Sequence, residues 1–347
     1  MTGEVDEVNR GRRRRLAVFA LLVTICVVGA VGYAVIDLKR YRGAMSDAPG
    51  VPQTRARSYA DQPRIVFRNT AIGDSYGLVA EVPIADPAAP RAVSEVACDR
   101  VDATSEVVSC LRTKRGVVTT YQWLELGSDL VTNATHALAG IPSRTRLAED
   151  GSLVASTSFV SGHSYMQVGF STATVIREFG GKSLGNLEDF QLIINGKEVA
   201  PVDRNIWGVT FTSDDNTFYA TAATRGTPYL VRGDLDARTL TAVASPAECP
   251  SISPDGRRVA YKVDVAKGRV TTWKLAVLDL ETGERTMLDA GKSSVDDQVE
   301  WLDQDTLLFG LPRADEAGVT DVWSLDTRAS ATPTVFITQA WSPAVVR

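Results

Sequence analysis

The stretch "GKSLG", Gly181–Gly185, matches the G-x-S-x-G pattern that places the nucleophilic serine of many hydrolases on a sharp turn. Such a serine needs a strand before it, a helix after it, and an acid and a histidine later in the chain. The segment that follows, "NLEDFQLIING", is too short for that helix, and the only histidines, His136 and His163, both precede Ser183. We therefore expect a glycine-rich turn between strands here, and a protein that is not an enzyme.

Phosphate and metal binding have weak support in the sequence. In "GGKS" and "AGKSS", Ile176 and Thr286 stand where a phosphate-binding loop requires its first glycine. Two histidines and no C-x-x-C pair argue against a zinc site. The acidic segments "SPDG", "SDDN" and "LDQD" could bind calcium if they converged, but they do not match the EF-hand loop, and turn stabilisation also explains them. We expect no cofactor, with calcium as the alternative.

The cysteines indicate an oxidising compartment. Cys98 and Cys110 bracket "DRVDATSEVVS", and if this stretch is a hairpin centred near Thr104, the two thiols face each other. A disulfide between them would stabilise the fold by about 3 kcal/mol in the chain-entropy model, and such bonds persist outside the cytoplasm. The alternative is two separate buried cysteines. Cys249 is left without a partner, and we interpret it as a buried apolar residue.

The N-terminal segment predicts a membrane anchor. Residues 1–15 are arginine-rich, and Leu16–Ile36 contains no charged residue. As a helix, this stretch would be about 31 Å long, the thickness of the hydrocarbon core. More positive charge precedes the span than follows it, which predicts a cytoplasmic N-terminus and an extracytoplasmic C-terminal domain in the cell membrane. A cleaved signal peptide is the alternative.

The rest of the chain divides into a linker and one large domain. Residues 38–63 are rich in Pro, Ala, Ser and charge, which is typical of a flexible tether, and residues 16–37 form the span. The whole chain has a net charge of −5, but basic residues concentrate in residues 1–42, so residues 43–347 carry a net charge of −9. An acidic body is unsuited to polyanions, so we expect no nucleic-acid partner.

From Arg64 onward, short runs rich in Val, Thr, Tyr and Phe alternate with turn residues, as in "MQVGF", "WGVTF" and "RVAYKVDV", which predicts an all-β domain. The unit that begins "ISPDGRRVAYKVDV" contains four expected strands and recurs about every 40–45 residues, the length of a β-propeller blade. We predict a six-bladed β-propeller with these blades: 64–96, 97–139, 141–201, 205–245, 248–290 and 298–338.

The turns of the repeat share a chemistry. Pro254 presets φ near −65°, Asp255 bonds the backbone of its own turn, and Gly256 accepts positive φ. We predict equivalent structural turns, with Asn216 in the left-handed position of its turn. The residues are Asp150, Gly151, Asp215, Asn216, Thr282 and Gly283.

The last residues predict how the ring closes. The segment "AWSPAVVR" resembles the first strand of a blade but has no strands after it, and the first blade shows only about three strands of its own. We therefore predict that Trp341–Val346, including Val345, forms the innermost strand of the first blade. A frayed tail is the alternative.

The segments "CPSISPDGRRVAYK" and "LAVLDLETG" resemble the repeat of the TolB-type (WD40-like) propellers. The Arg-rich start, the single span, "NIWGVTFTSDDNTFYAT" and the terminal "SPAVVR" further resemble membrane-anchored TolB-like proteins of high-GC Gram-positive bacteria. This resemblance implies a protein-interaction scaffold outside the cytoplasm. TolB itself has an N-terminal α/β domain and works with an outer-membrane lipoprotein. The tether here is too short for that domain, so we do not transfer the partnership.

We therefore expect a non-enzymatic scaffold that binds an envelope protein, peptide or glycan at one end of the ring. The alternative is a calcium-dependent propeller hydrolase or lactonase with acids in the central channel. Unpaired acids converging in the channel would favour the enzyme, and a mixed-charge channel would favour the scaffold. The six tryptophans are interpreted as packing between blades, with an aromatic patch at a ring end as the alternative. Asn133 lies in an N-glycosylation sequon.

Overall fold

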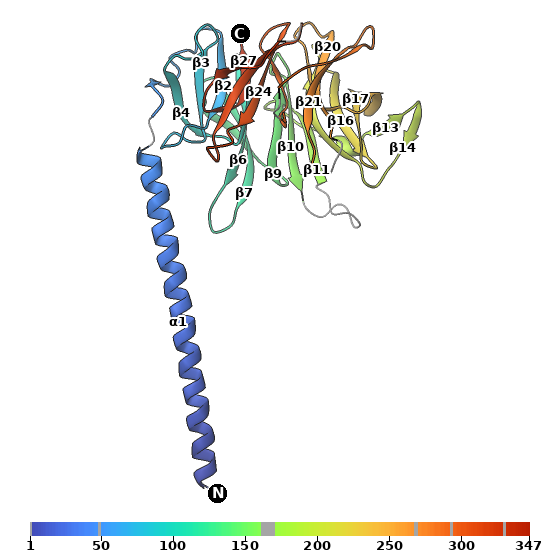
Figure 1. Ribbon diagram of the computed structural model, residues 1–347. Helices are drawn as coiled ribbons and strands as arrows, with labels where there is room; N and C mark the ends of the chain where they lie inside the picture. The colour runs from blue at the N-terminus through green and yellow to red at the C-terminus, as the bar shows by residue number, and fades with distance from the viewer. Residues whose placement is uncertain (1, 48–49, 161–170, 267–269, 292–293, 329–330) are drawn as a thin grey trace. The chain divides into compact units, whose positions relative to one another are not determined.

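The computed structural model describes residues 2–47, 50–160, 171–266, 270–291, 294–328 and 331–347. It divides into a unit built on the N-terminal helix and a much larger unit that begins at Val51 (Figure 1). The expected strand "MQVGF", Met166–Phe170, and His163 lie outside the described residues.

The first unit is dominated by α1 (Thr2–Asp47), a helix of 46 residues. Its segment Arg14–Asp37 is long and apolar enough to cross a membrane, although a signal sequence near an N-terminus has the same character. The helix extends ten residues beyond the predicted span, so the linker assigned to residues 38–63 is shorter than predicted. The reason is that residues 38–47 contain good helix formers and no proline.

The second unit consists of six blades, each built around four antiparallel strands (Figure 1). From the inside outward, blade 1 contains β27 (Ala340–Val346), β2 (Arg64–Asn69), β3 (Leu78–Pro83), β4 (Arg91–Ala97) and the parallel β1 (Gln53–Thr54). Blade 2 contains β5 (Arg100–Ala103), β6 (Val107–Lys114), β7 (Thr120–Gly127) and β8 (Thr132–Ala137). Blade 3 contains β9 (Ile141–Leu147), β10 (Leu153–Val160), β11 (Ser171–Glu178) and β12 (Ser183–Asn186).

The remaining blades follow the same order. Blade 4 contains β15 (Asn205–Phe211), β16 (Thr217–Thr224), β17 (Thr227–Asp234) and β18 (Thr239–Ala244), with β13 (Gln191–Ile194) and β14 (Lys197–Val199) outside them. Blade 5 contains β19 (Glu248–Ile252), β20 (Arg258–Asp264), β21 (Trp273–Asp279) and β22 (Arg285–Met287). Blade 6 contains β23 (Glu300–Trp301), β24 (Thr306–Pro312), β25 (Thr320–Asp326) and β26 (Thr334–Ile337).

The blades form a closed ring, which confirms the predicted six-bladed propeller. The innermost strands contact one another in the cyclic order β27, β5, β9, β15, β19, β23 and back to β27. Each pair of neighbouring blades also has its own buried apolar cluster, including the pair formed by blades 6 and 1. A single blade could not bury these flanks, so the ring is the unit that folds.

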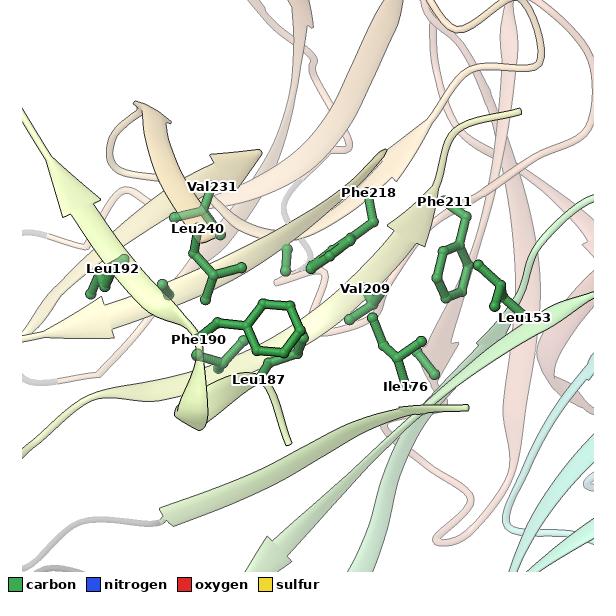
Figure 2. Packing of buried hydrophobic residues seen from close by; sticks show 14 of the residues in the cluster. Leu153, Ile176, Leu187, Phe190, Leu192, Val209, Phe211, Phe218, Val231 and Leu240 are labelled. Carbon is green, nitrogen blue, oxygen red and sulfur yellow. The ribbon is translucent and has the colours of Figure 1, made fainter. Parts of the chain in front are cut away.

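The interface between blades 3 and 4 shows how the flanks are buried (Figure 2). Leu153 and Ile176 of blade 3 face Phe211 and Phe218 of blade 4 in one continuous cluster. The short 3-10 helix η1 (Leu187–Asp189) contributes Leu187, which is fully buried. The chain between the two blades is therefore part of the core.

One predicted blade boundary is wrong. Residues 141–201 were assigned to blade 3, but the hairpin of β13 and β14 belongs to the sheet of blade 4. Strand β13 pairs in parallel with β18, and Leu192 lies opposite Leu240. Both leucines are fully buried in the cluster of Figure 2. Burial of Leu192 against blade 4 therefore outweighs proximity in the sequence.

The C-terminal strand closes the ring. Strand β27 pairs antiparallel with β2, so that Val346 lies opposite Arg64 and Trp341 opposite Arg68. Pro343 is compatible with this position because β27 is the innermost strand and one of its edges carries no sheet partner. The Ser342 hydroxyl also bonds the backbone of Val101 in blade 2. The first blade thus joins the two ends of the propeller chain.

Candidate functional site

The central channel is lined by alternate residues of the innermost strands. In β9 the partly buried residues Arg144 and Arg146 alternate with the fully buried residues Ser143, Thr145 and Leu147. Because successive side chains of a strand point to opposite faces, both arginines face the channel.

One end of the channel opens into a cavity of about 610 Å³, which we call the funnel. All six innermost strands contribute to its wall, together with the turns that join the first and second strands of several blades. Hydroxyl groups and charges dominate the lining: Asp102, Thr104, Ser105, Arg146, Glu149, Thr210, Thr212, Ser213, Ser251, Ser253, Asp255, Glu300 and Arg347.

An ion pair crosses the inner part of the funnel. Arg146 of blade 3 pairs with Glu300 of blade 6, and its other terminal nitrogen donates to the Val299 carbonyl at 3.1 Å. The buried Asp102 lies nearby and accepts a hydrogen bond from the Leu147 backbone at 2.7 Å. Burial raises the pKa of Asp102 to about 7, with Arg146 acting in the opposite direction and Glu300 in the same one. The inner wall is therefore a mixed-charge network.

Below the funnel the channel narrows to a small cavity of about 20 Å³, which we call the waist. Its polar lining comprises Arg100, Asp102, Arg144, Thr145, Arg146, Asp297, Gln298 and Ser342. Arg100 pairs with Asp297 at 3.3 Å and lies 4.7 Å from the centre of the Trp341 ring. Burial lowers the pKa of Arg100 to about 9, although the neighbouring carboxylate of Asp297 acts in the opposite direction.

Beyond the waist lies a second group of charges. Lys262 pairs with Asp296 and covers the Trp273 ring at 4.4 Å. Burial raises the pKa of Glu248, which lies opposite Lys262 in the sheet, to about 7.

The environment of Cys249 differs from the expected apolar one. The thiol is free and buried, but it interacts with the Arg144 guanidinium. The reason is that Cys249 lies at the start of an innermost strand, next to the charged channel.

The predicted disulfide is confirmed. Cys98, between blades 1 and 2, is bonded to Cys110 in β6. Both residues are buried in the cluster between these blades. The bond therefore links the closing blade to its neighbour.

The predicted turn residues occupy turns, with one correction. Gly151, Gly256 and Gly283 have φ of +76°, +71° and +73°. In blade 4 the left-handed residue is Asp215, with φ of +54°, and not Asn216. The carboxylate of Asp214 accepts backbone hydrogen bonds from Asn216 and Thr217, at 3.1 and 2.6 Å, so this residue takes the place of Asp255.

The Asp255 turn itself matches the expected chemistry. Its carboxylate accepts hydrogen bonds from the Ser253 hydroxyl and the Arg257 backbone, at 2.5 and 3.1 Å. Pro254, Asp255 and Gly256 also line the funnel. Thr282 donates from both its backbone and its hydroxyl to Asp279, so that turn is held by a different aspartate.

The "GKSLG" segment does not form a nucleophile elbow. Lys182 ends a turn, Ser183 begins β12, and only the short helix η1 follows. His136 bonds the buried Glu125 at 3.0 Å and stacks on Trp123 in blade 2. The segment is therefore a turn and an outer strand of blade 3.

The tryptophans divide between packing and the channel. Trp123 and Trp301 are buried, and their indole nitrogens donate to Ser109 and to the Ser251 carbonyl. Trp301 also contributes to the funnel wall, and Trp341 lies under Arg100. The prediction that the tryptophans pack between blades therefore holds for only some of them.

The charged residues of the channel were not predicted from the sequence as candidate site residues. A signal was present, because "CDRVDA" and "SRTRL" carry charges at alternate positions of innermost strands. In the equivalent strand of blade 5, β19, the only charged residue is Glu248 at its start.

Comparison with known proteins gives a fold. No protein-family profile matches the chain, and neither does any curated protein sequence. The structure of TolB from Acinetobacter baumannii is similar, with a TM-score of 0.56, 15% identity, and coverage of 88% of this chain and 69% of that one. A putative TolB from Agrobacterium tumefaciens has a TM-score of 0.51 and 11% identity, with coverage of 79% and 88%. A chain of a nidogen/laminin complex has a TM-score of 0.52 and 12% identity, with coverage of 82% and 98%. The chain therefore has the fold of a six-bladed β-propeller, similar to that of TolB, and carries one N-terminal apolar helix.

Proposed function

We propose that the protein is a membrane-anchored, extracytoplasmic scaffold that binds an envelope protein, peptide or glycan in the funnel without catalysing a reaction. The observation that carries the proposal is the funnel itself, a cavity of about 610 Å³ to which every blade contributes. Cavities of this size accommodate several residues of a peptide or a few sugar units. The TolB-like fold supports the same role by analogy only, because one fold hosts many functions.

The charges of the channel favour binding over hydrolysis. Of the two acids nearest the inner funnel, Glu300 is ion-paired with Arg146, and Asp102 lies close enough to interact electrostatically with the same guanidinium. Asp297 is paired with Arg100 in the same way. Across the described part of the chain, no group of three or more His, Cys, Asp or Glu side chains is arranged to hold a metal ion. We therefore interpret these acids as structural members of the charged network in the channel wall.

Site-specific photo-crosslinking on intact cells tests the proposal. A photoreactive amino acid replaces Ser213, an exposed residue of the funnel wall, and a matched variant carries it at the exposed Arg115, in the hairpin between β6 and β7. We expect envelope components to be captured from position 213 and not from position 115, with identification by mass spectrometry. Equal capture at both positions, or none at 213, would overturn the proposal.

The membrane topology has a separate test. In a variant with Arg115→Cys, a membrane-impermeant maleimide should label intact cells, because the residue is exposed. Labelling only after lysis would place the propeller in the cytoplasm.

A further inference from the structure

The waist of the channel contains an arginine without a carboxylate. Arg100 pairs with Asp297, and Arg146 pairs with Glu300. Among the described residues, no carboxylate oxygen lies within 4.0 Å of the Arg144 guanidinium. Its contacts are the Ser143 carbonyl, at 2.8 Å, and the Cys249 thiol.

The Nε atom of Arg144 is buried and has no hydrogen-bond partner. A buried donor without a partner is unfavourable because it has lost its hydrogen bonds to water, so an acceptor supplied by a ligand would favour binding. Arg144 is also one of the residues that line the waist, so part of its side chain borders an open space.

The waist continues into the funnel. Asp102 and Arg146 line both cavities. A ligand that fills the funnel can therefore present its end to Arg144. The waist is only about 20 Å³, which admits one or two atoms and excludes a bulky group.

These observations define the chemistry of the ligand. Arginine binds planar carboxylates with paired hydrogen bonds, which suits a narrow space. Asp297, which lies in the same cavity, disfavours a doubly charged phosphate. We propose that Arg144 is the recognition residue for the terminal carboxylate of a peptide chain whose preceding residues lie in the funnel. This inference rests on the proposed function, since it names the ligand class of the same site.

Peptide capture with the full-length protein in lipid nanodiscs tests the inference. Three random hexapeptide pools are used: one with a free C-terminal carboxylate, one amidated, and one amidated with glutamate at the last position. We expect the free-acid pool to be enriched, as read by mass spectrometry. Arg144-dependent capture of the amidated glutamate pool alone would overturn the α-carboxylate and leave a side-chain carboxylate as the ligand.

Variants give the quantitative test on the best peptide captured, by calorimetry. We expect R144Q to weaken binding about 10- to 100-fold, the loss typical of a charged hydrogen bond, and R144K to give a smaller loss. R115Q is the matched control at an exposed arginine and should bind like the wild type. Thermal unfolding of R144Q shows whether the variant folds.

A measurement on the unmodified protein removes any dependence on folding of the variant. Acetate should compete with the bound peptide, and acetamide should not. The inference is overturned if acetamide competes equally, if R144Q binds like the wild type, or if no pool is captured. Crosslinking at Ser213 with failure of all three pools would overturn the carboxylate inference alone and leave the proposed function intact.

Discussion

Arg146 and Glu300 form an ion pair between blade 3 and blade 6, which lie opposite each other in the ring. The two side chains are only 13% and 16% exposed. The pair therefore ties together blades that are distant both in sequence and around the circle. Arg146 lines both the funnel and the waist, so the pair lies where the two cavities meet.

Breaking this pair should destabilise the propeller. We expect R146M to lower the free energy of unfolding by about 2–4 kcal/mol, because Glu300 and Asp102 lose their shared cation. The measurement is urea unfolding in detergent, followed by tryptophan fluorescence. R328Q is the control, since Arg328 is 65% exposed in its ion pair and should change stability by no more than about 0.5 kcal/mol. Equal effects of both substitutions would contradict the role of the pair.

The buried carboxyl of Asp102 should make stability depend on pH. Its pKa is raised by burial from 3.8 to about 7, so between pH 4 and 7 the folded protein keeps a proton that the unfolded chain has lost. The contribution of this group is therefore complete below pH 4 and is lost as the pH rises through 7.

The variant D102N should remove that dependence. Relative to the wild type, we expect its stability to improve by about 1–2 kcal/mol between pH 5 and pH 8, as measured by urea unfolding at both values. Asp150→Asn, in an exposed turn, is the control and should follow the wild-type curve. Parallel curves for D102N and the wild type would show that Asp102 is ionised throughout.

Closure of the ring can be tested at Gly310. A Cβ atom at this position would lie 2.2 Å from the ring of Trp341 in the closing strand β27. We expect Gly310→Ala to cost about 2–3 kcal/mol in urea unfolding, because β27 must shift away from β24. Gly116→Ala is the matched control, since its Cβ would have no neighbour closer than 3.6 Å. If both variants have the same midpoint, Trp341 does not pack as described.

The disulfide should stabilise the junction of blades 1 and 2. We expect C98S/C110S to lose about 3 kcal/mol, since a closed loop of this size restricts the unfolded chain. Dithiothreitol should lower the urea midpoint of the wild type and leave the variant unchanged. A wild-type midpoint that is insensitive to the reductant would argue against a stabilising bond.

The turn of blade 4 should respond oppositely at two adjacent aspartates. Asp214→Ala removes acceptors for three hydrogen bonds and should cost about 1–2 kcal/mol. Asp215→Gly should leave stability unchanged or raise it by up to about 1 kcal/mol, because glycine is unstrained at positive φ. Thermal unfolding compares the two variants. An equal loss of stability in both would favour the turn as first predicted, with Asp215 in the place of Asp255.

The fold could be predicted from the sequence because its determinants are local. The Asp255–Gly256 turn and the alternating strands around it recur at blade length, and Trp341–Val346 lacked strands of its own. The parallel pairing of β13 with β18 could not be foreseen, since no local pattern specifies it. The sequence "SDDN" was ambiguous because either aspartate can hold such a turn, and only the hydrogen bonds distinguish them.

The candidate site was less predictable, for a physical reason. Arg144 and Asp297 are far apart in the chain, and their significance depends on which charges meet inside the ring. Alternation in "SRTRL" places two arginines on one face but does not show that one of them lacks a carboxylate. That distinction requires the three-dimensional arrangement of all six innermost strands.

The outermost strands of the blades have a consequence for contacts between copies of the protein. Five of them, β1, β12, β14, β22 and β26, are two to four residues long. The sixth, β8, reads "TNATHA" and is polar along its exposed side. Long apolar edges invite strand exchange and aggregation between chains, whereas short or polar ones discourage it. Many copies of this protein can therefore stand side by side on a surface without their sheets fusing.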